Sequence, residues 1–168
     1  SLVTDYQSPI SIFQSTIFQS PPISQSTLNL LSCDTFIMTA FKPQIIKFPG
    51  HTDAKGSLSF YDQHTALPFV VCRSYWIYNV PELQSRGGHA HKSGEQIIIC
   101  LQGTVVVRLF SQQGEAFDYT LNTAQEGLYI PPMYWGEMIF QDKAILLGLA
   151  SDDFNESDYI RNKKDFYG

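Results

Sequence analysis

The chain is poor in cysteine. Only Cys33, Cys72 and Cys100 occur among its 168 residues, an odd number at unrelated spacings. No disulfide framework of the kind that stabilises small secreted domains is therefore expected. Cys72 and Cys100 lie within apolar runs, which predicts buried free thiols. This cysteine usage favours a reducing compartment, and we expect a cytoplasmic protein.

Long apolar runs and a surplus of basic residues are also missing. No stretch of 18 consecutive apolar residues occurs, so the sequence predicts no membrane span. Residues 1–37 contain no Lys or Arg, whereas a signal peptide begins with a positively charged segment. The net charge of −5 argues against binding to nucleic acid or to an anionic membrane surface. An anionic ligand would have to be held by a few local cations.

The first 37 residues differ in composition from the rest. Nineteen of them are Ser, Thr, Gln or Pro, and only Asp5 and Asp34 are charged. Such a composition is typical of a low-complexity linker rather than of a packed core. Ordinary composition begins near Met38. We therefore expect an extension over residues 1–37 and one folded domain over residues 38–168.

The remaining sequence favours strands and tight turns. Aromatic residues make up 14% of the chain, which also holds 11 Gly and 9 Pro. Short runs of β-branched and aromatic residues recur about every 8–12 residues, as in all-β sandwiches and barrels. These runs predict strands over 44–48, 58–61, 69–78, 96–101, 104–110, 117–121, 127–130, 137–140 and 144–150. The Gln102-Gly103 pair indicates a hairpin-like break. Only residues 156–166 are predicted to be helical, with residues 151–153 as a possible N-cap.

The most specific local motif is Arg86-Gly-Gly-His89-Ala-His91-Lys92. Alternate residues of a strand face the same side, so His89 and His91 should project together. Four residues separate His91 from Gln96, and six more separate Gln96 from Gly103. This spacing resembles the first motif of the cupins, in which a glutamate ligand stands at the position of Gln96. The resemblance implies a cupin fold, a double-stranded β-helix barrel.

Two of the usual cupin metal ligands are missing. An amide replaces the carboxylate at Gln96, and Glu95, one residue away, faces the other side of the strand. Gly136 follows Pro131-Pro-Met-Tyr-Trp135 where a third histidine is expected. Because a catalytic metal needs three or four ligands, no metal is expected. Two free imidazoles, with an ordinary pKa near ~6.5, would instead serve as proton carriers.

Several separated segments resemble the nucleotide-sugar 3,4-ketoisomerases, the WxcM-like cupins. They are the histidine motif, residues 73–78, Leu128-Tyr-Ile-Pro-Pro132, residues 149–153 and Glu156-Ser-Asp-Tyr-Ile-Arg161. The resemblance implies conversion of a dTDP-4-keto-6-deoxyhexose into its 3-keto isomer, in deoxy-amino-sugar biosynthesis. The redox change is internal to the sugar, so no cofactor is expected.

The resemblance and the residue types together predict the roles of individual side chains. His89 and His91 are the expected catalytic acid–base pair. Cations and donors must stabilise a developing oxyanion and offset the pyrophosphate charge. The candidate substrate-binding residues are Arg73, Tyr75, Arg86, Lys92, Gln96 and Trp135. Trp135 could stack on the thymine or pack in the core, whereas the acidic residues of the tail are expected to cap a helix.

Two other readings of the sequence stay open. The chain could be a metal-dependent cupin acting on a small molecule, or a cupin that binds nucleotide sugars without catalysis.

The family resemblance also implies an assembly, because family members usually form dimers that exchange N-terminal strands. The predicted strand over residues 44–48 precedes Pro49-Gly50 and a polar stretch, which favours its exchange within a homodimer.

Overall fold

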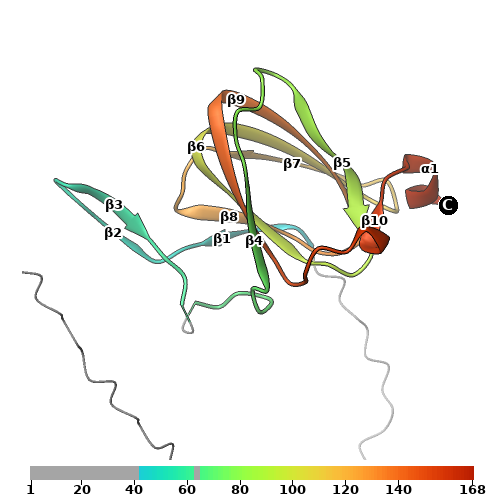
Figure 1. Ribbon diagram of the computed structural model, residues 1–168, viewed down its shortest axis with the longest axis horizontal. Coiled ribbons are helices and arrows are strands. Elements are labelled where there is room, and N and C mark those ends of the chain that lie inside the picture. The colour runs from blue at the N-terminus through green and yellow to red at the C-terminus, as the bar shows by residue number, and fades with distance from the viewer. Residues whose placement is uncertain (1–41, 63–64) are drawn as a thin grey trace, which may run out of the picture. The chain divides into compact units, whose positions relative to one another are not determined.

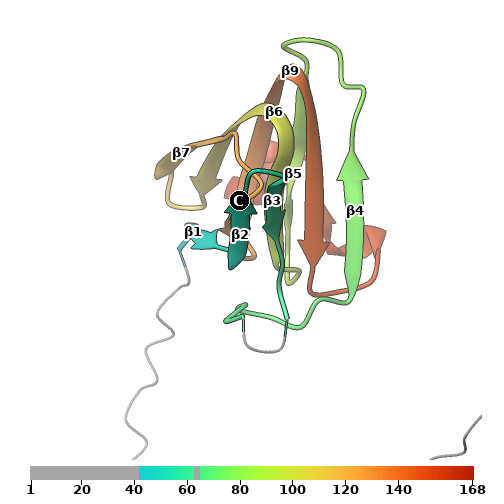
Figure 2. The ribbon, with the colours of Figure 1, turned by 90° about the vertical axis from the view of Figure 1, so that its left-hand side faces the viewer.

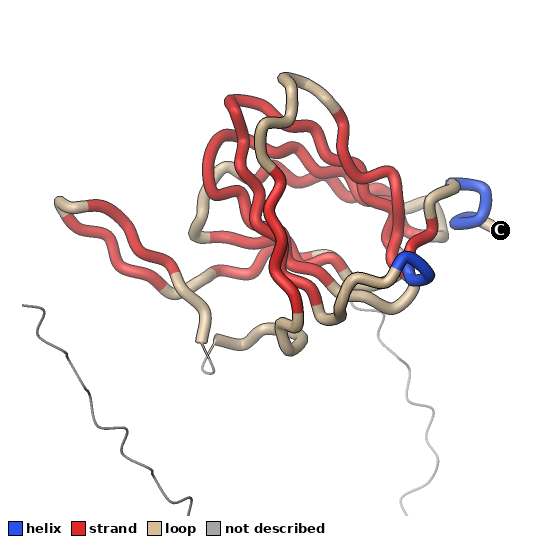
Figure 3. Tube along the Cα trace, viewed as in Figure 1, coloured by secondary structure: helices blue, strands red, loops and turns tan. Residues whose placement is uncertain are grey.

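The computed structural model describes residues 42–62 and 65–168, all within the unit Thr39–Gly168. The extension predicted over residues 1–37 and Cys33 lie outside the described residues. Strands dominate the described part of the chain, and its one α-helix, α1 (Lys163–Tyr167), is short (Figures 1 and 3). None of its helices is long and apolar enough to cross a membrane.

Two long antiparallel strands organise the fold. β6 (Gln96–Ser111) and β9 (Tyr134–Ala150) pair along their whole length, from Gln96 opposite Ala150 to Ser111 opposite Tyr134. The first half of β6 also pairs with β8 (Glu126–Ile130), which in turn pairs with β1 (Gln44–Lys47). Its second half pairs with β7 (Ala116–Leu121). Each long strand therefore belongs to two sheet regions.

β9 divides its partners in the same way. Its C-terminal half pairs with β4 (Arg73–Ile77), which runs beside it in Figure 2, and its N-terminal half with β5 (Ser85–His91). β5 then pairs with the two-residue strand β10 (Tyr159–Ile160). Two sheet regions that share bent strands and face each other form the predicted all-β cupin barrel, so the predicted fold class is confirmed.

The bend in β6 requires a glycine. Gly103 has φ +73°, and a Cβ there would lie 2.7 Å from both Ala144 Cα and the Asp142 carbonyl oxygen. The irregular register between Cys100 and Thr104 lies at the same point. The predicted hairpin at Gln102-Gly103 is therefore wrong: β6 continues through this bend, because both of its halves pair with β9.

Side chains of β6 alternate between two apolar clusters, as expected for a strand with period two. Ile98 and Cys100 belong to the main core, which also holds Val107, Leu109, Leu128, Phe140 and Leu146. Ile97 and Ile99 face the other side, where Phe48, Tyr129 and Leu149 bury them. Cys100 is buried as predicted, but Cys72 is exposed, so that prediction is wrong.

The C-terminal tail is not the single helix predicted over residues 156–166. It contains a 3₁₀ turn, η1 (Glu156–Asp158), then β10, then α1. The caps are Asn155 and Asn162, whose side chains accept bonds from Ser157 N and Lys164 N. Phe166 of α1 is completely buried against Trp135 and Ala90, which anchors the end of the tail on the barrel.

The hairpin β2 (Gly50–Asp53) and β3 (Gly56–Ser59) forms a separate two-stranded sheet that projects from the barrel (Figure 1). Seven of its eight strand residues are exposed. β1, by contrast, pairs with β8 of the same chain. β1 is the terminal strand of its sheet and pairs through one edge with β8, so its exchange with a partner subunit stays a prediction.

Candidate active site

His89 and His91 lie side by side on β5, with ring centroids 5.3 Å apart. The strand reaches this arrangement through a bulge at Gly87 and Gly88, which have φ of +93° and +67°. A Cβ on Gly87 would lie 2.5 Å from the Gly136 carbonyl oxygen. A glycine is therefore required where β5 approaches β9 just before the histidines.

A cavity opens beside the two imidazoles. Its walls are largely apolar and include Ile98, Val107, Leu109, Ile130 and Met138, while His89, His91, Gln96 and Tyr134 supply polar groups. Burial lowers the pKa of both histidines. For His91 the hydrogen bond and charge of Asp158 oppose this effect, and for His89 the Gly87 backbone does. Both imidazoles are neutral at pH 7, the state in which they can accept a proton.

His91 lies within a chain of hydrogen bonds. Tyr75 donates its hydroxyl proton to Gln96 Oε1 over 2.6 Å, and Gln96 Nε2 contacts His91 Nε2. On the other side of the ring, Nδ1 of His91 lies 2.7 Å from Asp158 Oδ2. A carboxylate only accepts hydrogen bonds and an amide nitrogen only donates them. This network therefore places the proton of His91 on Nδ1 and the lone pair on Nε2.

Asp158 keeps its negative charge in this site. Burial raises its pKa, but hydrogen bonds from His91 and from the Ser93 backbone and hydroxyl outweigh burial and lower the pKa to about 2. Sequence reasoning missed this residue and expected the tail acids to cap a helix. No local signal marks it, because its position depends on the pairing of β10 with β5.

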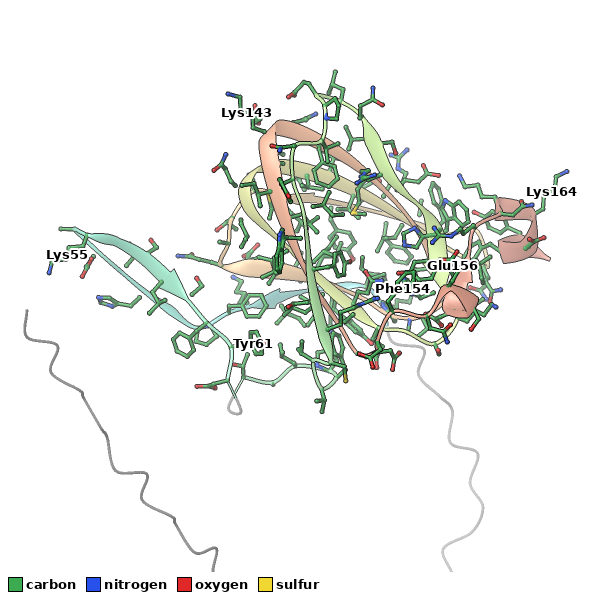
Figure 4. The ribbon with its side chains drawn as sticks, in the orientation of Figure 1. Lys55, Tyr61, Lys143, Phe154, Glu156 and Lys164 are labelled. Carbon is green, nitrogen blue, oxygen red and sulfur yellow. The ribbon has the colours of Figure 1, made fainter. Side chains whose placement is uncertain are left out.

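Tyr159, the next residue, was also missed. It lies opposite His91 in the β5–β10 pair, and its ring centroid is 4.3 Å from that of His91 and 5.0 Å from that of His89. The segment before it reaches the same end of the barrel, where Figure 4 labels Phe154 and Glu156 beside β10. The C-terminal tail thus forms one wall of the site.

Tyr75 reaches Gln96 because Gly148 faces it on the neighbouring strand. The two residues are directly opposed in the β4–β9 pair, and the Tyr75 ring lies against the glycine backbone. Burial raises the pKa of Tyr75 far above its ordinary value, so the phenol is a hydrogen-bond donor at neutral pH. The missing side chain at Gly148 therefore fixes one end of the hydrogen-bond chain.

Arg73 supplies positive charge next to this chain. Its guanidinium lies 5.7 Å from the ring centroids of both Tyr75 and Phe154. Nε is buried and, within the described residues, has no hydrogen-bond partner. Arg73 lines a small cavity together with His91, Gln96 and Tyr159. The structure thus brings Arg73, Tyr75 and Gln96 to the histidines.

The other three candidates lie elsewhere. Arg86 and Lys92 are exposed, and Lys92 Nζ donates to the Ser157 carbonyl over 2.6 Å. Trp135 is 5% exposed, packs against Phe166, and donates from Nε1 to Glu137. Trp135 therefore packs in the core, which was the alternative to stacking on a base, because neither face of its ring is open. None of the three lines the cavity beside the histidines.

Few side chains beside the histidines could serve as further ligands for a metal ion. Among residues 42–62 and 65–168, no three His, Cys, Asp or Glu side chains are grouped to hold an ion. Gln96 occupies the expected carboxylate position, buried between Tyr75 and His91. Glu95 faces the other way and accepts a hydrogen bond from Tyr129.

A cupin barrel holding two neutral, adjacent imidazoles in an apolar cavity defines a candidate enzyme for acid–base chemistry on a small ligand. Comparison with known families agrees with this class. The family model FdtA, described as WxcM-like, C-terminal, matches residues 41–168. The chain therefore belongs to this family, and the family predicted from the sequence is confirmed.

Characterised relatives cover most of the barrel. The TDP-4-oxo-6-deoxy-α-D-glucose-3,4-oxoisomerase of Aneurinibacillus thermoaerophilus is 35% identical over 125 residues, which are 73% of this chain and 88% of the relative. The crystal structure of QdtA, a sugar 3,4-ketoisomerase from Thermoanaerobacterium thermosaccharolyticum in complex with TDP, has a TM-score of 0.71 and 38% identity, and the match covers 74% of this chain and 91% of QdtA. The WlaRB TDP-quinovose 3,4-ketoisomerase of Campylobacter jejuni has a TM-score of 0.69 and 34% identity over 74% and 96% of the two chains.

Proposed function

We propose that this protein is a sugar-nucleotide 3,4-ketoisomerase that converts TDP-4-keto-6-deoxyglucose into the 3-keto isomer. Relatives at 34–38% identity carry 3,4-keto- or oxoisomerase names, and one was crystallised with TDP-4-keto-6-deoxyglucose. The observation on this chain that carries the proposal is the pair of neutral imidazoles, 5.3 Å apart, in an apolar cavity.

The reaction moves two hydrogens and needs no external oxidant. The C3–H bond breaks and a C4–H bond forms, while the hydroxyl proton moves from O3 to O4. The ketone at C4 acidifies the C3 hydrogen, and a neutral imidazole can remove it to give an enediolate. Protonation at C4 then completes the transfer. The imidazolium formed when one ring accepts the C3 proton is the acid that protonates C4, and the adjacent ring can relay this proton.

Arg73 is positioned to stabilise the enediolate. Its charge lies beside Tyr75, and its buried Nε is not occupied by a protein acceptor in the described residues. Arg73 shares a small cavity with His91 and Gln96, and a cation held in a cavity stabilises developing negative charge more strongly than one in water. Tyr75 already donates to Gln96, so its role in this proposal is to orient that amide rather than to bind the oxyanion.

The test is direct incubation with TDP-4-keto-6-deoxyglucose and NMR analysis of the sugar. The proposal expects a product with its ketone at C3, and loss of more than ~10²-fold in rate when either histidine becomes asparagine. A binding protein without turnover would give TDP affinity and an unchanged sugar, which would refute the proposed activity.

For assembly, we propose a homodimer in which the β2–β3 hairpin exchanges with a second copy. An isolated two-stranded hairpin is at best marginally stable in water, yet this one projects with almost all of its residues exposed. Apolar side chains on the barrel surface, such as Trp76 and Leu101, are 63% and 47% exposed. A second copy would cover such a surface.

We also propose a cytoplasmic location, because Cys72 and Cys100 are free thiols.

A further inference from the structure

The carboxylate of Asp158 lies behind His91, on the side of the ring opposite Gln96. We propose that Asp158 is a positioning residue that fixes His91 as the Nδ1–H tautomer and directs its Nε2 lone pair toward Gln96 and the cavity. This inference rests on the proposed function, because it assigns Asp158 a part in the same reaction.

Asp158 is held at both ends of its carboxylate. Oδ2 accepts from His91 Nδ1 at 2.7 Å, while Oδ1 accepts from the Ser93 backbone N and from the Ser93 hydroxyl, each at 2.8 Å. The Asp158 carbonyl also accepts from Lys92 N at 2.8 Å. The side chain is only 16% exposed. Three hydrogen bonds, from His91 and Ser93, thus fix the carboxylate, and a fourth, from Lys92 N, fixes the backbone of the same residue.

The backbone around Asp158 is equally constrained. Tyr159 and Ile160 pair with His91 and Ala90, so Asp158 directly precedes a short ladder. Beyond it, Phe166 is fully buried, and Lys163 Nζ lies 2.7 Å from Glu137 Oε1. The tail is therefore attached on both sides of the site, and the carboxylate is placed before any substrate arrives.

The two histidines differ because only one has a carboxylate partner. Nδ1 of His89 is buried and, in the described residues, has no hydrogen-bond partner of normal geometry. The nearby Glu156 carboxylate is engaged by Arg161, at 2.5 and 2.8 Å. Asp158 therefore acts on His91 alone, and the two rings need not share the same proton-transfer role.

Gln96 supports the same tautomer from the other side. Its Oε1 accepts from Tyr75, so its Nε2 is left to donate to His91 Nε2. If the His91 proton were on Nε2, it would face an amide hydrogen, and Nδ1 would face the carboxylate without a proton. Both contacts would then be repulsive, which is why the arrangement selects one tautomer.

The charge of Asp158 also raises the pKa of His91 against the lowering by burial. Removing the charge should therefore lower the pKa further, so that the ring stays neutral to lower pH but is a weaker base. The other titratable or charged groups around this ring come from β5, β4, the residue before β6 and the C-terminal tail: His89, Arg73, Tyr75, Glu95, Asp152, Asp153, Tyr159 and Arg161. None of them replaces the Asp158 hydrogen bond.

The test is Asp158→Asn in the full chain, with Ser93→Ala as a matched control that leaves the His91–Asp158 contact in place. Loss of the carboxylate partner of a metal-ligating histidine costs roughly 10–100-fold, and we use the same scale for His91. We expect a fall in kcat of that size with KM changed less than about threefold, and an acid limb of the kcat–pH profile moved to lower pH. Ser93→Ala should change kcat only a few-fold and leave the limb in place, and Asp158→Glu should recover part of the activity.

NMR of the His91 ring nitrogens separates this inference from the proposed activity. In the free enzyme, the wild type should show the Nδ1–H tautomer, and Asp158→Asn should lower the ring pKa, whatever the substrate is. Wild-type kcat and pH profile in Asp158→Asn would overturn the inference, as would a kcat loss with an unmoved profile and tautomer. Absence of isomerase activity in the wild type would instead refute the proposed function and leave the ring measurement to decide the role of Asp158.

Discussion

Replacing Gly148 by alanine should move the Tyr75 ring away from Gln96 without altering any polar group. A Cβ at this position would lie 2.2 Å from Tyr75 Cζ and 2.5 Å from Cε1. Nonbonded carbon atoms rest about 3.5 Å apart, so the ring must withdraw by about 1.3 Å. The hydroxyl, now 2.6 Å from Gln96 Oε1, would then lie beyond hydrogen-bond distance.

The expected cost follows from these two changes. Overpacking a filled site costs about 1–3 kcal/mol, and loss of the hydrogen bond about 0.5–1.5 kcal/mol. Loss of this hydrogen bond should also disturb the orientation of His91. If it raises the activation free energy by about 1.4 kcal/mol, kcat falls about tenfold. Tyr75→Phe should give a similar fall in kcat at a smaller cost in stability, because the ring stays on Gly148.

The assays are thermal unfolding and steady-state kinetics with TDP-4-keto-6-deoxyglucose. Gly114→Ala is the matched control. Gly114 has φ +84°, and an added Cβ there meets nothing within 4 Å, so the change costs about 1–2 kcal/mol in backbone strain alone. It should lower the Tm and leave kcat intact. Wild-type kcat in Gly148→Ala, together with a lowered Tm, would show that the Tyr75–Gln96 contact does not support the reaction.

Three further outcomes are expected. Because burial lowers the pKa of both histidines below 6.5, kcat should stay level from pH 8 to 7 and fall only below pH 6.5. A fall centred above pH 6.5 would contradict neutral imidazoles as the working state. Activity should survive EDTA, since two imidazoles without further ligands hold a divalent ion poorly; abolition by EDTA and rescue by one metal would contradict this. Deleting residues 1–37 should leave dimer and rate intact, whereas deleting residues 50–59 should give a monomer by light scattering; an unchanged dimer without the hairpin would refute the exchange.

The parts of the fold that depend on local pattern could be predicted from the sequence. Alternation and turn residues indicated an all-β barrel, and the His89–His91 spacing indicated a shared strand face. The bend at Gly103 was located but misread as a hairpin. A strand that bends and a hairpin that reverses both need a glycine with positive φ, and only the shared partner β9 distinguishes them.

The parts of the site that depend on long-range pairing could not be predicted. Asp158 and Tyr159 reach the histidines through a two-residue strand, too short to leave a periodic pattern. For Trp135 the sequence left stacking on a base and core packing open, and the contact that decides for packing comes from Phe166, 31 positions later in the chain. Arg73 and Tyr75 were proposed from the family resemblance and from the need for cations and donors, and β4 carries them to Gln96 and His91.

In the proposed reaction, the histidine pair moves the ketone from C4 to C3. The most direct measurement is proton NMR of TDP-4-keto-6-deoxyglucose in deuterated water with wild type, His89→Asn and His91→Asn. We expect the wild type to lose the C3 proton signal and to gain a hydrogen or deuterium at C4, and we expect both changes to be slowed more than ~10²-fold in each variant. A product that keeps its C4 ketone and is inverted at C3 or C5, or wild-type rates in both variants, would contradict the proposed reaction.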